Sequence, residues 1–244
     1  IFLPSFSSDA AFAQAVIAVL GTTISPYLFF WQASQEVEEQ KRRRVQPDRA
    51  ALPKLRRELK RIQTDTWIGM AYSNAISLFI IIATAATLHA NGITNIETSA
   101  EAALALRPVA GEFAFLLFAV GIIGTGLLAV PVLAGSAAYA VCEAMGWASG
   151  LNRKAKNARA FYGVIAVSAA VGLALNFIGV NPISALYWTA ILNGVLAAPL
   201  MALMLIVASN KRIMGELILP PSLRAVGWLA TFVMAVASVA FFVL

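Results

Sequence analysis

The residues that could do chemistry lie beside a proline in an otherwise apolar run, GTTISPYLFFWQ at 21–32. Pro26 has no backbone N–H and its ring clashes with the preceding turn, so it breaks or kinks a helix. In lipid, backbone outside a helix persists only where it is buried in protein or lines a cavity. The freed carbonyls near Thr22 and Thr23, with the Ser25 hydroxyl, would then be oxygen ligands for a cation. A proline kink packed against neighbouring helices is the alternative.

Two amide side chains lie deep in apolar segments of the sequence. Asn74 occurs in AYSNAIS, and Asn193 lies midway along the run that follows Pro182. An amide in lipid is costly unless it finds a partner, so we expect both side chains to face the interior of the helix bundle. There they would complete the polar surroundings of the ion or its pathway. For Asn193, a purely structural hydrogen bond between helices is an equal alternative.

Motifs of soluble enzymes are absent from the sequence. There is one histidine, His89, and neither an HExxH nor a GxSxG pattern occurs. Cys142 is the single cysteine, which excludes a disulfide framework and a CxxC metal site. We therefore expect that the protein is not an enzyme and that it needs no cofactor.

The composition predicts the elements that position these residues. The chain has 244 residues, 60% hydrophobic and 12% charged, with a mean hydropathy of +0.79. A soluble domain carries about twice that charged fraction, so the sequence predicts an all-α polytopic membrane protein. A span needs about 20 apolar residues. We expect a single transmembrane domain over 1–244 with spans near 12–34 (broken at 21–26), 66–88, 112–142, 160–180, 184–208 and 224–244.

The charges between the spans indicate the orientation. All but one of the 18 basic residues lie in three alternate segments, 36–66, 143–159 and 209–224. The exception is Arg107. By the positive-inside rule, the basic loops are cytoplasmic and both ends of the chain lie outside. We also expect the protein in the cell inner (plasma) membrane. KRRR at 41–44 would touch anionic lipid headgroups, and we expect no nucleic acid partner.

The segments around the first span carry further expectations. The sequence LPKLRRELKR at 52–61 predicts a short helix on the inner surface, and Thr64–Thr66 offers N-caps for the second span. Residues Ile1–Ser8 predict a loop. We expect that this chain is the C-terminal portion of a longer protein.

Three stretches resemble the Nramp family of divalent metal transporters: GTTISPYLFF before a charged loop, AYSNAIS in the next span, and SNKRIMGE after the fifth. The similarity runs over essentially the whole chain. It implies the second half of a LeuT-type inverted-repeat transporter, with a broken first helix, and import of Mn²⁺ or Fe²⁺ usually coupled to protons. The implied partners are the lipid bilayer, the divalent cation and the missing N-terminal helices of the same transporter.

The broken helix departs from the family pattern at informative positions. The family's sixth helix is unwound at A-x-x-M-P-H, which supplies a carbonyl and a methionine thioether to the metal. Thr22 takes the alanine position and still offers its carbonyl, and Ser25 takes the methionine position. These two residues are the implied metal ligands, with Pro26 holding the break open. Tyr27 replaces the histidine, which leaves proton coupling an open question.

The exchange of a soft thioether for a hard hydroxyl at Ser25 should weaken the preference for transition metals over Mg²⁺. The sequence therefore resembles a divergent branch, closer to the Nramp-related magnesium transporters. Two other functions are alternatives. One is a LeuT-type carrier of a small organic solute, whose carboxylate would meet the half-helix that begins near Tyr27. The other is a membrane scaffold that transports nothing.

Overall fold

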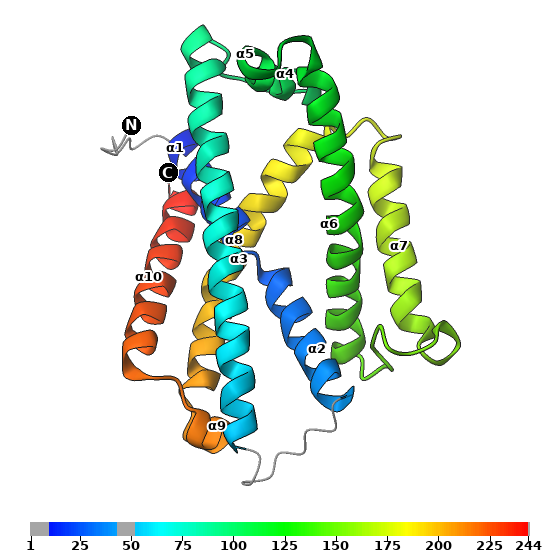
Figure 1. The fold of residues 1–244 in the computed structure, drawn as a ribbon, viewed down its shortest axis with the longest axis vertical. Coiled ribbons are helices and arrows are strands. Elements are labelled where there is room, and N and C mark those ends of the chain that lie inside the picture. The colour runs from blue at the N-terminus through cyan, green and yellow to red at the C-terminus, as the bar shows by residue number, and fades with distance from the viewer. Residues whose placement is uncertain (1–9, 43–51, 244) are drawn as a thin grey trace. The chain divides into compact units, whose positions relative to one another are not determined.

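The computed structural model describes residues 10–42 and 52–243, and the regular structure in these ranges is helical (Figure 1). Three basic residues of the first loop, Arg43, Arg44 and Arg49, lie outside the described residues. The predicted N-terminal loop, Ile1–Ser8, also lies outside them. The long helices are α1 (Ala10–Thr23), α2 (Pro26–Arg42), α3 (Leu52–Thr87), α6 (Ala114–Ala144), α7 (Arg159–Leu175), α8 (Pro182–Ala208) and α10 (Pro221–Val243).

Short helices connect the long ones. They are η2 (His89–Asn91), α4 (Ser99–Ala103), η3 (Leu104–Leu106), α5 (Arg107–Ala110), η4 (Gly111–Phe113), η5 (Ala155–Asn157), α9 (Lys211–Met214) and η6 (Gly215–Leu217). Thr98 begins α4 with a capping box, because its hydroxyl accepts from the Glu101 N–H while the Glu101 carboxylate accepts from the Thr98 N–H.

Five stretches of the described residues are long and apolar enough to cross a membrane, with α1 and α2 counted together. The expected span at 160–180 is shorter, because α7 ends at Leu175 and the Asn176 amide donates to the carbonyls of Gly172 and Leu173. Seventeen residues rise roughly 25 Å, against about 30 Å of hydrocarbon. The six-span topology therefore stays a prediction.

The predicted surface helix and the second span form one continuous helix. α3 runs for 36 residues, so the expected boundary at Thr64–Thr66 is wrong. Good helix formers occupy 54–63, and no glycine or proline interrupts the chain between Pro53 and Gly69. The Thr64 hydroxyl donates back to the Lys60 carbonyl inside the helix and so caps nothing.

The described residues form two compact units, and α2 passes from the first into the second after Phe29. The first unit contains residues 10–29 and 184–243. In it, α1 lies beside α10 and contacts α8 through two apolar clusters. Ile17 is fully buried against Ile191, and Ile24 and Leu20 pack against a cluster that contains Met234.

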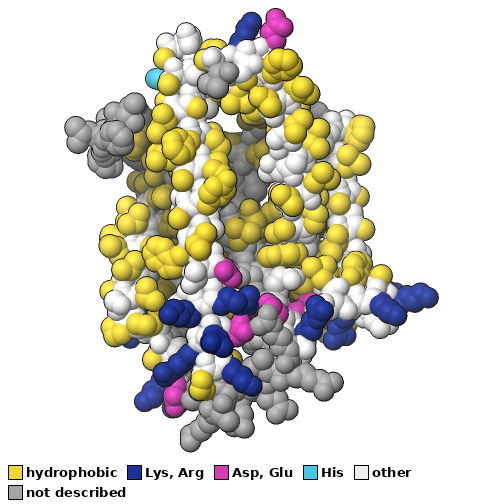
Figure 2. All heavy atoms as spheres, viewed as in Figure 1, with side chains coloured by type: hydrophobic (Ala, Val, Ile, Leu, Met, Phe, Trp, Pro, Cys, Tyr) yellow, Lys and Arg dark blue, Asp and Glu magenta, His cyan; other side chains and the backbone are white. Residues whose placement is uncertain are grey.

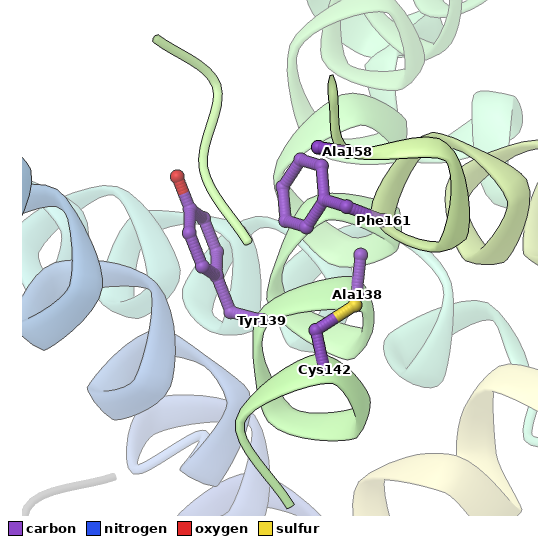
Figure 3. Close-up of a cluster of buried hydrophobic side chains, with 5 residues drawn as sticks. All are labelled: Ala138, Tyr139, Cys142, Ala158 and Phe161. Carbon is purple, nitrogen blue, oxygen red and sulfur yellow. The ribbon is translucent and has the colours of Figure 1, made fainter. Parts of the chain in front are cut away.

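The second unit contains residues 30–183, and α6 and α7 form its core. Tyr139 and Cys142 of α6 and Phe161 of α7 are almost fully buried. Figure 3 shows the phenyl ring of Phe161 facing α6, with the Tyr139 hydroxyl pointing away from the cluster. Trp31 of α2 packs against the same cluster, and its ring lies where a Cβ at Gly135 would be.

Large apolar side chains cover the outer faces of α3 and α6 (Figure 2). Phe79 is 69% exposed and Leu127 is 74% exposed. Apolar surface on this scale is typical of helices solvated by lipid. Lys and Arg side chains gather where α3 begins and around the connection from α6 to α7 (Figure 2).

Candidate functional site

The first helix is broken where the sequence places its polar residues. α1 ends at Thr23 and α2 begins at Pro26, which leaves Ile24 and Ser25 outside both helices. In an unbroken helix the Thr22 carbonyl would accept a hydrogen bond from the N–H of residue 26. Because residue 26 is proline, that donor does not exist. Proline at the first position of α2 is also favourable, since its fixed φ is already helical.

The Ser25 hydroxyl takes the place of the missing backbone donor. It donates to the Thr22 carbonyl at 3.0 Å and to the Gly21 carbonyl at 3.1 Å. Ser25 is only 3% exposed, and Pro26 is buried as well. A hydroxyl oxygen and a freed carbonyl oxygen therefore lie within hydrogen-bond distance of each other, in a largely dry place.

Proline alone does not explain this break. Pro131 and Pro199 each lie inside a helix that continues on both sides, in α6 and α8 respectively. At Pro26 the helix stops, and the residue before it carries a hydroxyl that satisfies the freed carbonyl. The combination of serine and proline therefore fits a helix that ends here with its freed carbonyl satisfied better than a helix that only bends at proline.

The threonine side chains stay within α1. The Thr22 hydroxyl donates to the Ala18 carbonyl at 2.8 Å, and the Thr23 hydroxyl donates to the Val19 carbonyl at 3.0 Å. Both bonds run back one turn along the helix. It is the Thr22 carbonyl, and not its hydroxyl, that the break makes available.

Gly21 does not interrupt the helix, although the sequence suggested a break from this residue onward. It lies inside α1, and a Cβ there would collide with the Ala190 carbonyl oxygen and the Gly194 backbone nitrogen of α8. A Cβ at Gly194 would in turn meet the Ile17 carbonyl oxygen at 2.6 Å. Two glycines 173 positions apart thus bring the backbones of α1 and α8 together, as small residues do in membranes.

This contact places one of the predicted amides near the break. Asn193 immediately precedes Gly194 and is half-buried, so α8 presents it within one residue of the contact with Gly21. Tyr27 lies in the first turn of α2 and is also half-buried. Asn74 belongs to the other unit, where its side chain is exposed midway along α3.

The oxygen pair at the break is chemically suited to a hard divalent cation. Carbonyl and hydroxyl oxygens are ligands for Mg²⁺, Ca²⁺ and Mn²⁺, whereas thioethers and thiolates favour softer metals. Among residues 10–42 and 52–243, no group of three or more His, Cys, Asp or Glu side chains could hold a metal ion. His89, at the end of the second expected span, is exposed.

A second polar cluster, which sequence reasoning missed, lies in the other unit. The Tyr139 hydroxyl donates to Glu38 Oε1 at 2.6 Å, and Gln35 Nε2 donates to the Tyr139 oxygen at 3.1 Å. One turn away, Ser34 donates to Glu143. The available signal was a tyrosine near the end of a long apolar helix, since a buried phenol needs a partner for its hydroxyl.

Comparison with known proteins gives the family. The model of the Nramp family, described as natural resistance-associated macrophage protein-like, matches residues 1–244. No curated protein matches the chain. The match includes the broken helix and the stretches AYSNAIS and SNKRIMGE, on which the sequence resemblance rests. The chain therefore belongs to the Nramp family of divalent metal transporters, which has the LeuT-type fold.

Proposed function

We propose that this chain forms the C-terminal helices of a secondary transporter that moves a divalent cation inward by alternating access. The cation would cross the cell inner membrane, with the basic loops on the cytoplasmic side. Its direct ligands here are the Thr22 carbonyl and the Ser25 hydroxyl. The observation that carries this proposal is their 3.0 Å separation at a break where Pro26 removes the helical donor.

The geometry suits a shared ion. Two oxygens 3.0 Å apart can both lie about 2.1–2.5 Å from one cation, which is the range for Mg²⁺ and Ca²⁺. In the absence of the ion, the Ser25 proton bridges them. On binding, that proton turns away and the hydroxyl oxygen offers a lone pair. Water, Asn193 and the N-terminal helices of the same transporter complete the shell, and no resident cofactor is needed.

The ligand chemistry also predicts the cargo. A hydroxyl does not discriminate against hard ions as a thioether does, so Mg²⁺ should compete with Mn²⁺ and Fe²⁺. Tyr27 follows the proline where the family pattern has histidine. Histidine is the side chain best suited to carrying a proton at neutral pH, and this position lacks it, so proton coupling through it should be weak.

The test is uptake by the full-length protein in liposomes. We expect a tenfold excess of Mg²⁺ to inhibit Mn²⁺ uptake by the wild type strongly. Ser25→Met should restore the preference for Mn²⁺ and make uptake resistant to Mg²⁺. The matched control, Ser168→Met, makes the same exchange in α7, which is not part of the broken helix.

Three results would argue against the proposal. If neither metal is transported, the cargo is of another class. If Ser25→Met leaves the competition unchanged, the break only packs. If Ser168→Met changes selectivity equally, the effect does not report on the break.

A further inference from the structure

A pocket lies where the end of α2 meets the connection from α6 to α7. Its volume is about 450 Å³. Three basic side chains line it: Lys41 and Arg42 from the last turn of α2, and Arg153 from the connection. Ser149 and Asn152 add a hydroxyl and an amide to the lining.

Among the described residues, one acidic side chain lines this pocket, and it already has several hydrogen-bond partners. Glu38 accepts from the Tyr139 hydroxyl, from the Leu151 N–H at 3.1 Å, and from both the backbone N–H and the side-chain amide of Asn152, at 3.2 and 2.7 Å. These bonds satisfy its two oxygens. The described lining therefore carries three positive charges against one negative charge, and the carboxylate oxygens are already occupied by neutral donors, so an entering group meets a net positive charge.

Side chains of α2 and α7 also contact the backbone of the connection from α6 to α7 and hold it in place. Gly150 has φ of +132°, and a Cβ there would collide with the Glu38 carboxylate. Tyr162 donates to the carbonyl oxygens of Leu151 and Arg153. These contacts fix the backbone of the connection, and the fixed backbone places Arg153 near the end of α2.

The end of a helix does not account for this arrangement. The negative end of the α2 dipole favours Lys41 and Arg42 in the last turn. It gives no reason for a third cation from another element on the same cavity, where like charges repel. An anion bound among the three would offset that repulsion.

We propose that this pocket binds a phosphate group, carried by the headgroup of an anionic phospholipid. Guanidinium groups match phosphate oxygens in charge and in hydrogen-bond geometry, and an ammonium adds a point charge. Basic pockets at the cytoplasmic ends of membrane helices are suited to such headgroups. Free inorganic phosphate has the same chemistry, so the experiment distinguishes the two sources.

The experiment titrates the purified full-length protein with phosphatidylglycerol and counts bound lipid by native mass spectrometry. The triple variant Lys41→Ala, Arg42→Ala and Arg153→Ala should lower the apparent affinity at least tenfold. The control triple Lys54→Ala, Arg56→Ala and Arg57→Ala removes the same charge from the exposed start of α3, outside the pocket. It should change the affinity less than twofold.

A measurement on the wild type alone does not depend on the folding of a variant. In nanodiscs that contain phosphatidylglycerol, acetylation of Lys41 should slow at least fivefold relative to nanodiscs of phosphatidylcholine, while acetylation of Lys54 stays constant. If millimolar inorganic phosphate protects Lys41 equally without anionic lipid, the phosphate site stands but its source is soluble. Equal losses in both triple variants, or no protection by lipid or phosphate, would overturn the proposal.

Discussion

Ser25 has one hydroxyl proton and two carbonyl oxygens within reach, those of Gly21 and Thr22. The side chain therefore has two roles that can be separated. As a donor it satisfies the backbone that Pro26 leaves open, and as an oxygen it is a candidate ligand. An alanine at this position removes both the donor and the ligand oxygen. A methionine removes the donor and replaces the ligand oxygen with a thioether sulfur.

We expect Ser25→Ala to lower the free energy of unfolding by about 1 kcal/mol, because a buried carbonyl loses its donor. Uptake of Mg²⁺ and Mn²⁺ by the full-length protein should fall at least tenfold, because the substitution removes the proposed ligand oxygen. Chemical denaturation and liposome uptake measure the two effects. Thr189→Val is the control, since it removes an exposed hydroxyl that bonds within α8. Normal uptake by Ser25→Ala would contradict the assignment of the ligand.

At the scale of elements, the two halves of the broken helix have different kinds of contact. α1 is held by close approach of backbones, with Gly21 against Gly194. α2 is held by hydrogen bonds of Ser34, Gln35 and Glu38 in addition to the packing of Trp31 on α6. A close contact between backbones is disrupted by adding a side chain, as in Gly21→Ala. A contact through hydrogen bonds is disrupted by removing an acceptor, as in Glu38→Gln.

Gly21→Ala should destabilise the protein by about 1–3 kcal/mol, because the new methyl group would meet backbone atoms of α8 that cannot turn aside. The midpoint of thermal unfolding is the measurement. Gly163→Ala in α7 is the control, since a Cβ there meets nothing within 4 Å. A melting temperature for Gly21→Ala equal to that of Gly163→Ala would mean that α1 and α8 are not in close contact.

Glu38→Gln should loosen the connection from α6 to α7. The amide N–H groups of Leu151 and Asn152 lose a charged acceptor, and the new side-chain amide brings donors toward donors. We expect hydrogen exchange of these two amides to accelerate about tenfold, in line with hydrogen bonds to charged groups. Glu216→Gln, an exposed site in η6, is the control. Unchanged exchange at both amides would show that Glu38 does not hold the connection.

At the scale of the whole molecule, the charge pattern predicts which loops face the cytoplasm. In a Cys142→Ala background, we expect Thr94→Cys and Phe177→Cys to react with a membrane-impermeant thiol reagent in intact cells. Lys154→Cys should react only after permeabilisation. Phe177 also tests α7, because a helix of 17 residues that fails to span would leave Phe177 and Lys154 on the same side.

The sequence predicted the features that depend on single residues. The sequence predicted the break from Pro26 together with the polar residues before it, whereas proline alone would also have predicted breaks at Pro131 and Pro199, where the helices continue. The contact of Gly21 with Gly194 and that of Glu38 with Tyr139 join residues far apart in sequence, and nothing local distinguishes them from other glycines and acids. The boundary expected at Thr64–Thr66 was wrong because a change from charged to apolar composition is not a change of backbone conformation.

The length of α3 has a mechanical consequence. Thirty-six helical residues extend about 54 Å, and about 30 Å of this suffices to cross the hydrocarbon. The remainder extends beyond the hydrocarbon as a stiff helical segment, in which Arg61 forms ion pairs with Glu36 and Glu39 of α2. A tilt of about 10° within the membrane would swing the far end of a rod this long by roughly 9 Å. A small change in the tilt of α3 within the membrane would therefore move its N-terminal end far enough to be measured with a spectroscopic distance probe.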